Sequence, residues 1–176
     1  MSEEDWYIDV GSNPNFEQGE ILLNCPVIIP PKNLQSKMQV KIKEYNVIIL
    51  SQTCDILNDK IDAILVCPIY FLEDLSKGFK FLKNDVGREV LRRGNVVGLH
   101  LLNKSSYFSD FLVVDFRKVY SIHKNVIKTI IRSVKIRQCL ISPYKEHLSQ
   151  AFARFFMRVG LPNDIEPFCK EIYQIS

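Results

Sequence analysis

The fold is decided at Val47-Ile48-Ile49-Leu50-Ser51-Gln52-Thr53-Cys54-Asp55, where an apolar run rich in β-branched residues gives way to polar side chains. β-Branched residues favour strands, and a strand that is apolar at every position is buried on both faces. Ala63–Ile69 is a second run of this kind, and Asn58-Asp59-Lys60 supplies turn residues between the two runs. We therefore expect two central strands, the first of which ends in polar residues.

Weaker strand patterns flank this pair. Met38–Lys43 alternates apolar and polar residues, which is typical of a half-exposed strand. Further strands are expected at Glu20–Asn24, ending near Cys25-Pro26, at Val96–Leu102, at Phe111–Asp115 with Lys118–Ile122, and at Val134–Ile141. Phe111–Asp115 and Lys118–Ile122 form either a strand pair or one bent strand.

Helical patterns lie in the middle and at the C-terminal end of the chain. Leu75–Arg93 is charged, and its second part, Asp85–Arg93, has helical spacing, so this segment predicts an insertion with one or two short helices. Pro143–Val159 is the clearest helix, with Ser142 as its N-cap and an apolar stripe along one face. One or two helical turns are also expected at Val126–Arg132, and a short helix at Ile165–Ile172.

The length and composition of the chain are typical of a globular protein. The chain has 176 residues, of which 47% are hydrophobic and 24% are charged, so it can bury one core and resembles ordinary globular proteins. No apolar run approaches the roughly 20 residues that a membrane helix needs, and the acidic start lacks the pattern of a signal peptide. We expect a single cytoplasmic domain without a membrane segment.

Cysteines and histidines are spread too widely for a typical zinc site. The cysteines are Cys25, Cys54, Cys67, Cys139 and Cys169, and the histidines are His100, His123 and His147. A structural zinc site needs closely spaced pairs of ligands, and the chain contains no Cys-x-x-Cys pair. We expect no metal and no cofactor, and we expect most of the cysteines to be small core residues.

Charge is unevenly distributed along the chain. Residues 1–76 contain 5 basic and 12 acidic residues, a balance of −7, whereas residues 77–145 contain 15 basic and 4 acidic residues, a balance of +11. A basic face is typical of proteins that bind nucleic acid or an acidic protein partner. Candidate contacts in the basic segment are Arg88, Arg92, Arg93 and Arg117. The alternative is that the two halves neutralise each other within the fold.

Five strand phrases occur in an order that resembles the MazF/PemK family: Gly19-Glu20-Ile21-Leu22, Val47–Ser51, Leu65–Ile69, Phe111–Asp115 and Arg117–Ile122. The resemblance covers residues 17–125 and implies an α+β fold, in which a small MazF/PemK-like β-barrel carries the helical insertion at 75–93. From the residues themselves we expect an N-terminal arm, 1–16, that docks through Trp6 and Tyr7, and a C-terminal segment, 126–176, whose amphipathic helix packs on the barrel. A homodimer and a bacterial toxin–antitoxin or phage-defence setting are further implications.

The positions at which this family cuts RNA hold different residues here. Family members that cut RNA carry an Arg-Pro pair before the second long strand and a threonine or serine after Pro-Ile, whereas this chain has Tyr45-Asn46 and Tyr70. In-line attack on RNA needs a cation and a positioned hydroxyl or base, but tyrosine rings can stack on bases. The resemblance therefore implies a non-catalytic binding module. The alternative is a ribonuclease toxin whose relocated site uses Arg88, Arg92 or Arg93.

The polar strand end at Ser51–Asp55 is a separate candidate site. Cys54 is a candidate nucleophile, with Asp55, His100 or His123 as its partner, and Gln52 and Thr53 are candidate binding residues. A carboxylate beside a thiol opposes formation of the thiolate. Besides binding, this segment has two other interpretations. One is a Cys54-dependent enzyme or thiol sensor, and the other is a structural turn in which Cys54 packs inward.

The segment Ser142–Pro162, together with the Ser-Gln-Thr-Cys-Asp phrase, resembles an uncharacterised group of small bacterial proteins. This second resemblance implies a helical appendage and no chemistry. Arg154 and Arg158 stand four residues apart on the polar face of the helix, so they are candidates for binding phosphate or carboxylate groups. The alternative is a solvated face, and His147 is interpreted as a surface or packing residue.

Overall fold

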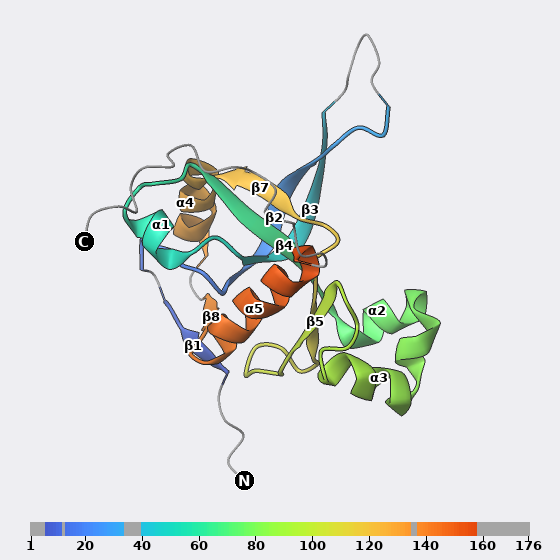
Figure 1. Cartoon of the computed structure of the whole chain (residues 1–176). Helices are drawn as coiled ribbons and strands as arrows, with labels where there is room; N and C mark the ends of the chain where they lie inside the picture. Colours follow the sequence, from blue (N-terminus) through green and yellow to red (C-terminus); the bar gives the residue numbers. More distant parts are fainter. Residues whose placement is uncertain (1–5, 12, 34–39, 135–136, 158–176) are drawn as a thin grey trace, which may run out of the picture.

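The computed structural model describes residues 6–11, 13–33, 40–134 and 137–157. Within these residues, eight strands form an antiparallel sheet accompanied by five α-helices. Figure 1 shows how these elements are arranged. The predicted mixed α+β class is therefore confirmed. In this described part of the chain, no helix is both long and apolar enough to cross a membrane.

The elements follow the predicted order. The strands are β1 (Tyr7–Asp9), β2 (Glu20–Ile29), β3 (Lys41–Ile49), β4 (Ala63–Phe71), β5 (Leu99–Leu102), β6 (Leu112–Asp115), β7 (Tyr120–His123) and β8 (Gln138–Leu140). The helices are α1 (Thr53–Leu57), α2 (Leu72–Gly78), α3 (Asp85–Arg92), α4 (Lys124–Ser133) and α5 (Tyr144–Phe156), with a 3-10 turn, η1, at Lys80–Lys83. The helical insertion and the long C-terminal helix are confirmed.

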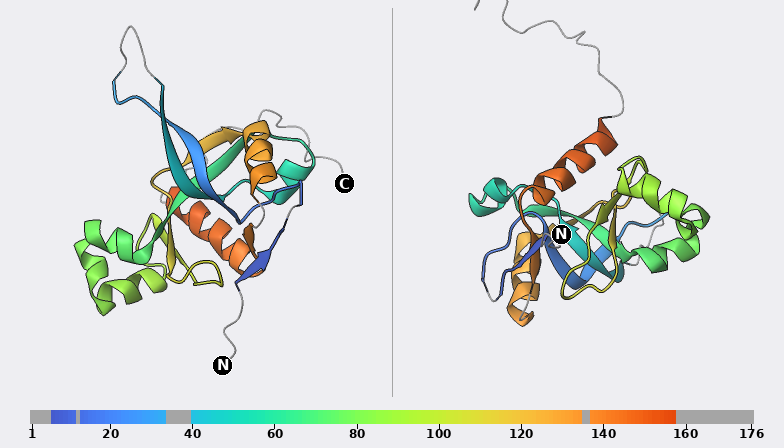
Figure 2. Two further views of the ribbon diagram at one scale, coloured as in Figure 1. Left: turned by 180° about the vertical axis from the view of Figure 1, so that it is seen from behind. Right: turned by 90° about the horizontal axis from the view of Figure 1, so that it is seen from below.

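The predicted central run is buried on both faces over Val47–Ile49, the C-terminal part of β3, whereas Lys41–Glu44 at the start of this strand are exposed. Val47 and Ile49 belong to one apolar cluster, which also contains Ile127 of α4, whereas Ile48 belongs to a second cluster with Leu148 of α5. Successive side chains of a strand point to opposite faces of the sheet. The view from below in Figure 2 accordingly shows α4 and α5 on opposite sides of the sheet.

The strands are hydrogen-bonded in the order β1-β8-β2-β3-β4-β6-β5, and β7 also pairs with β4. Both β6 and β7 run antiparallel to β4, through the pairs Ile69↔Val114 and Ala63↔His123, so they behave as the one bent strand that the sequence allowed. Among the described residues these pairings form an open path and not a closed ring, although Cα atoms of β2 and β7 approach within 8 Å. A closed barrel is therefore not observed.

Two predicted strand boundaries are wrong. β2 does not end near Pro26 but continues to Ile29, with an irregularity between Leu22 and Cys25 where Asn24 takes a left-handed conformation at φ 50°. Pro26 is tolerated because β2 pairs with β8 only at Glu20 and Ile21, so β2 is an edge strand at Pro26. The strands expected at Met38–Lys43, of which Met38 and Gln39 lie outside the described residues, and at Val47–Ser51 are joined from Lys41 to Ile49 as one strand, β3. Strands β2 and β3 pair as a hairpin that projects from the body (Figures 1 and 2).

The N-terminal segment is more regular than the predicted arm. Trp6 docks by stacking on Tyr144, with ring centroids 3.9 Å apart, and Tyr7–Asp9 forms β1, which pairs with β8. The short helix α1 was also not predicted, and the N-cap of α5 is Pro143 and not Ser142. Arg158, Cys169 and the helix expected at Ile165–Ile172 lie outside the described residues.

Gly87 allows α3 to pack closely on η1, which gives a first prediction. A Cβ atom at this position would overlap the backbone carbonyl oxygen of Phe81, and a backbone atom cannot rotate away as a side chain can. We expect Gly87→Ala to lower the free energy of unfolding by at least about 2 kcal/mol, measured by chemical denaturation. Gly78→Ala is the matched control, because its Cβ would meet nothing within 4 Å. Equal stability of the two variants would contradict the close approach.

Candidate functional site: a tyrosine–lysine surface

The structure brings together Tyr45 and Tyr70, the two tyrosines that the sequence indicates as candidates for stacking on bases. Tyr45 on β3 and Tyr70 on β4 meet edge to face, with ring centroids 6.5 Å apart. Tyr120, the first residue of β7, stacks on Tyr45 with centroids 5.9 Å apart and an interplanar angle of 19°. All three side chains are half-buried, so the rings are fixed by the fold and remain accessible from outside.

Two lysines complete this group of residues. Lys43 Nζ lies 4.8 Å from the centroid of the Tyr45 ring, and Lys118 Nζ lies 5.1 Å from the centroid of the Tyr70 ring. Lys118 also donates a hydrogen bond of 3.1 Å to the Tyr70 hydroxyl, which raises the pKa of Lys118 and keeps it charged at neutral pH. We call Lys43, Tyr45, Tyr70, Lys118 and Tyr120 the tyrosine–lysine surface.

A groove of about 580 Å³ lies beside this surface, and Tyr70, Phe79, Asp115, Arg117 and Lys118 are among the residues that line it. Arg117 donates from Nε and Nη2 to the buried Asp115 carboxylate, at 2.7 and 3.0 Å, and this bonding raises the pKa of Arg117. The guanidinium lies over the Phe79 ring at 4.9 Å. Lys118 also pairs with this carboxylate, with Nζ 3.6 Å from Oδ2. The groove is therefore bordered by two fixed cations that share one buried carboxylate, Asp115.

The local sequence explains why lysines accompany the tyrosines. The pattern Lys-x-Tyr occurs at Lys43-Glu44-Tyr45 and again at Lys118-Val119-Tyr120. Side chains two positions apart in a strand point to the same face, so the pattern in β3 places Lys43 beside the Tyr45 ring. Lys118 lies in the bend before β7, and its ammonium lies over the Tyr70 ring of the neighbouring strand. Sequence reasoning identified Tyr45 and Tyr70 but missed Lys43, Lys118 and Tyr120, and this repeated pattern was the signal that would have found them.

The polar strand end, Ser51–Asp55, forms the turn that leads from β3 into α1. Thr53 Oγ1 accepts a hydrogen bond from the Gln18 backbone amide, the Gln52 carbonyl caps the start of α1, and Asp55 pairs with Lys60 at 3.5 Å. Cys54 is exposed, so the expectation that it packs inward is wrong. Among the described residues, its thiol contacts the Asp55 carboxylate at 3.8 Å and no histidine, which does not favour a thiolate.

Cysteine accessibility gives a second prediction. Burial raises the pKa of the Cys25 thiol to about 11 and those of Cys67 and Cys139 to about 12, whereas Cys54 is exposed. At neutral pH we expect iodoacetamide to alkylate Cys54 in the native protein and to modify the three buried thiols at least about 100-fold more slowly than in urea. Peptide mass spectrometry resolves the sites. Rapid native labelling of Cys67 would contradict its placement in the core.

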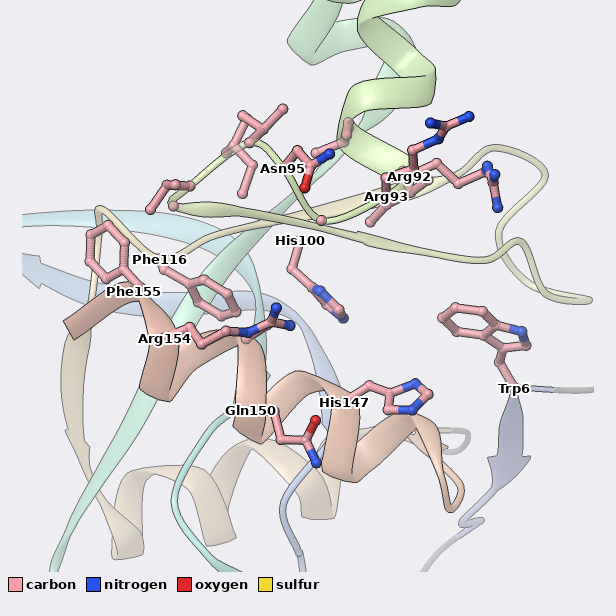
Figure 3. A pocket seen from close by; sticks show the side chains of 18 residues that line it. Trp6, Arg92, Arg93, Asn95, His100, Phe116, His147, Gln150, Arg154 and Phe155 are labelled. Atoms are coloured by element: carbon pink, nitrogen blue, oxygen red, sulfur yellow. The ribbon is translucent and has the colours of Figure 1, made fainter. Parts of the chain in front are cut away.

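The predicted arginines fall into two groups. Arg88 donates to Glu73, at 2.8 Å, and to the Leu82 carbonyl, at 3.0 Å, so it ties the helical insertion together. Arg92 and Arg93 both donate to Glu89 at 2.7 Å, which lowers the pKa of Glu89 to about 2. Together with Arg154 of α5, Arg92 and Arg93 line a cavity of about 780 Å³, shown in Figure 3.

His100, which lines this cavity, gives a third prediction. Burial, with smaller contributions from His147 and Arg154, lowers the pKa of His100 from 6.5 to about 4. The unfolded chain therefore binds a proton between these two pH values that the folded chain does not bind, so stability falls as the pH falls through this window. We expect His100→Gln to reduce this loss by up to about 3 kcal/mol, measured by urea unfolding across the window. Identical pH profiles would contradict a buried, neutral His100.

A scan against protein-family models matches no family, and a search of the curated proteins finds no match. The resemblance to the MazF/PemK family therefore stays a prediction. In the described parts of the chain, no group of three or more histidines, cysteines or acidic residues is arranged to hold a metal ion.

Proposed function

We propose that this chain is a non-catalytic, MazF/PemK-like module that binds single-stranded nucleic acid on the tyrosine–lysine surface. The observation that carries the proposal is the fixed group of three half-buried tyrosine rings with a lysine ammonium beside two of them. Proteins that bind single strands combine aromatic side chains, on which bases stack, with cations that contact the backbone phosphates. The tyrosine–lysine surface supplies both groups.

Stacking selects single strands over duplexes, because the bases of a duplex already stack on one another. Each base that stacks on an aromatic side chain contributes about 1–3 kcal/mol. Lys43, Lys118 and the neighbouring Arg117 are the cations beside the rings that can contact phosphates, and both Lys118 and Arg117 also pair with Asp115. Contacts to about three phosphates on a single strand correspond to a slope of about −2 in a plot of log affinity against log salt concentration.

The side chains beside the tyrosine rings favour binding of nucleic acid without cleavage, because neither Asp115 nor Tyr120 is suited to act as a general base. Asp115 is fully buried and held by Arg117, so it is poorly placed to take a proton from a ribose hydroxyl. Burial raises the pKa of Tyr120, so its phenol stays neutral at physiological pH. The resemblance supports the same assignment, since Tyr45 and Tyr70 replace the residues with which family members cut RNA. The approach of β2 to β7 is compatible with a barrel-like curl of the sheet.

Fluorescence anisotropy with labelled oligonucleotides tests this proposal. At low salt we expect single-stranded RNA and DNA to bind at least about tenfold more tightly than a duplex of the same length, with a salt slope near −2. Equal or tighter binding of the duplex, or no binding at low salt, would overturn the proposal. RNA recovered from the same mixtures should be intact, and a ladder of fragments would instead support the ribonuclease alternative.

A further inference from the structure

A second cavity, of about 780 Å³, lies between α5 and the segment that leads from the end of α3 into β5. Figure 3 shows α5 below the cavity, β5 above it and Trp6 at one end. Sites for small organic ligands are typically between about 300 and 1,000 Å³ in volume. The cavity is therefore large enough for a ligand of the size of a nucleotide.

The side chains that line this cavity favour an anion. Arg92, Arg93, Arg154, His100 and His147 contribute to the lining, and none of the described residues that line it is Asp or Glu. Glu89, which is outside the lining, holds Arg92 and Arg93 in place and partly neutralises them. Arg154 is exposed and makes no hydrogen bond or ion pair with any described residue, so its guanidinium is available to a ligand.

His100 adds an unsatisfied polar atom to the cavity. Its Nε2 is buried and, among the described residues, has no hydrogen-bond partner. In Figure 3 the imidazole extends from β5 into the space above Arg154 and His147. Since a buried polar atom without a partner is costly, a ligand that bonds to Nε2 gains an interaction that the empty cavity lacks. A phosphate group offers acceptor oxygens and, when singly protonated, a donor, so it suits either tautomer of the ring.

Aromatic side chains complete the lining. The Trp6 indole is fixed by its stack on Tyr144, and Phe116 and Phe155 lie against each other with ring centroids 6.3 Å apart. These rings give the cavity apolar walls beside its cationic groups. Inorganic phosphate would leave the apolar walls uncovered, whereas a phosphate carried on a flat organic group covers both kinds of surface.

We propose that this cavity binds the phosphomonoester of a nucleotide, either as a free mononucleotide or as the 5′-phosphorylated end of a strand. Arg154 and His147 lie on one side of the phosphate, His100 Nε2 on the other, and the base covers the aromatic walls. The proposal does not depend on the tyrosine–lysine surface, whose five residues do not line this cavity. A negative result for one of the two proposed binding sites therefore leaves the proposal for the other site standing.

Trp6 provides a direct measurement, because it is the one tryptophan in the chain and it lines the cavity. Its fluorescence would be followed during titration with adenosine and uridine monophosphates, the matching nucleosides, inorganic phosphate, and an oligonucleotide with either a 5′-phosphate or a 5′-hydroxyl. We expect saturable binding of the monophosphates, with nucleosides and inorganic phosphate at least about tenfold weaker. Calorimetry measures the same affinities without relying on the fluorophore.

Two arginine variants make the measurement specific to the cavity. Arg154→Gln removes a guanidinium that pairs with none of the described residues, and it should weaken binding of the monophosphate at least about tenfold, since hydrogen bonds to charged groups are the strong ones. Arg132→Gln removes an exposed arginine of α4 that does not line the cavity, and should leave affinity unchanged. Equal thermal unfolding of both variants shows that the fold is intact.

The outcomes separate the two sources of the ligand. Binding of mononucleotides assigns a free nucleotide, whereas binding of only the 5′-phosphorylated oligonucleotide assigns a strand end. Equal affinity for inorganic phosphate and mononucleotides would overturn the nucleotide assignment, and so would equal affinity of Arg154→Gln and Arg132→Gln. No fluorescence change and no heat with any of these ligands would overturn the proposal entirely. Tyr45→Ala with Tyr70→Ala should leave this titration unchanged.

Discussion

Replacing Arg137 with methionine is expected to lower the free energy of unfolding by about 3–5 kcal/mol, because it leaves a buried carboxylate without its counter-charge. Arg137 and Glu20 are both almost fully buried and form an ion pair through Nη1 and Oε2. The two Nη atoms also donate to the backbone carbonyls of Asn13 and Asn15. One guanidinium therefore joins β2, the start of β8 and the N-terminal segment.

The matched control for this variant is Arg132→Met, since Arg132 is an exposed arginine near the end of α4. Surface substitutions of this kind usually change stability by less than about 0.5 kcal/mol. Adding Glu20→Gln to Arg137→Met should recover part of the loss, because the second change removes the uncompensated charge. Urea unfolding measures all of these variants. If Arg137→Met were as stable as Arg132→Met, the buried ion pair would not be a principal support of the fold.

Replacing both Tyr45 and Tyr70 with alanine should weaken binding of single-stranded nucleic acid by at least about 30-fold. Two stacked bases contribute roughly 2–6 kcal/mol together, at about 1–3 kcal/mol for each base. The loss should come from stacking and not from the Tyr70 hydroxyl, which bonds to Lys118. Tyr45→Phe with Tyr70→Phe therefore keeps most of the affinity. Fluorescence anisotropy at constant salt measures each variant.

Tyr107→Ala is the matched control for the alanine variant. Tyr107 is an exposed tyrosine whose hydroxyl lies 3.5 Å from an Asp9 carboxylate oxygen, and it does not belong to the tyrosine–lysine surface. Its replacement should leave the affinity unchanged. Unaltered binding by the double alanine variant, with thermal unfolding close to that of the parent protein, would contradict the proposed function.

The central strands could be predicted because their side chains are apolar at every position. Val47, Ile48 and Ile49 are fully buried, as a strand covered by helices on both faces requires. α5 could be predicted from its apolar stripe, and Phe152 and Phe155 pack on the core as expected. These elements follow from local patterns, since the period of the apolar residues fixes both the type of element and the face that it buries.

Other features depend on contacts that local patterns do not contain. The strand through Pro26 is possible because β2 is unpaired on one edge at that point, which is a property of the whole sheet. α1 has five residues, of which only Ile56 is buried, so it leaves little periodic signal. β1 exists because β8, which is distant in the sequence, lies beside it.

The candidate sites likewise depend partly on features visible in the sequence and partly on contacts between distant segments. Tyr45 and Tyr70 were found through a resemblance, but the stack of Tyr45 on Tyr120 joins strands that are far apart in the sequence. The second cavity forms where α5 packs near β5, and this brings Arg154 and His147 toward His100. Neither histidine has a local sequence pattern that indicates a ligand site. The structure is needed to show that these residues share a cavity.

The most direct test of the proposed function is to map where a single strand contacts the protein. Single-stranded RNA containing 4-thiouridine would be crosslinked to the protein with ultraviolet light, and the modified peptides identified by mass spectrometry. We predict crosslinks at Tyr45, Tyr70 or Tyr120 that unlabelled single-stranded RNA removes and duplex does not. Crosslinks confined to other parts of the chain, with none at these three tyrosines, would contradict the account.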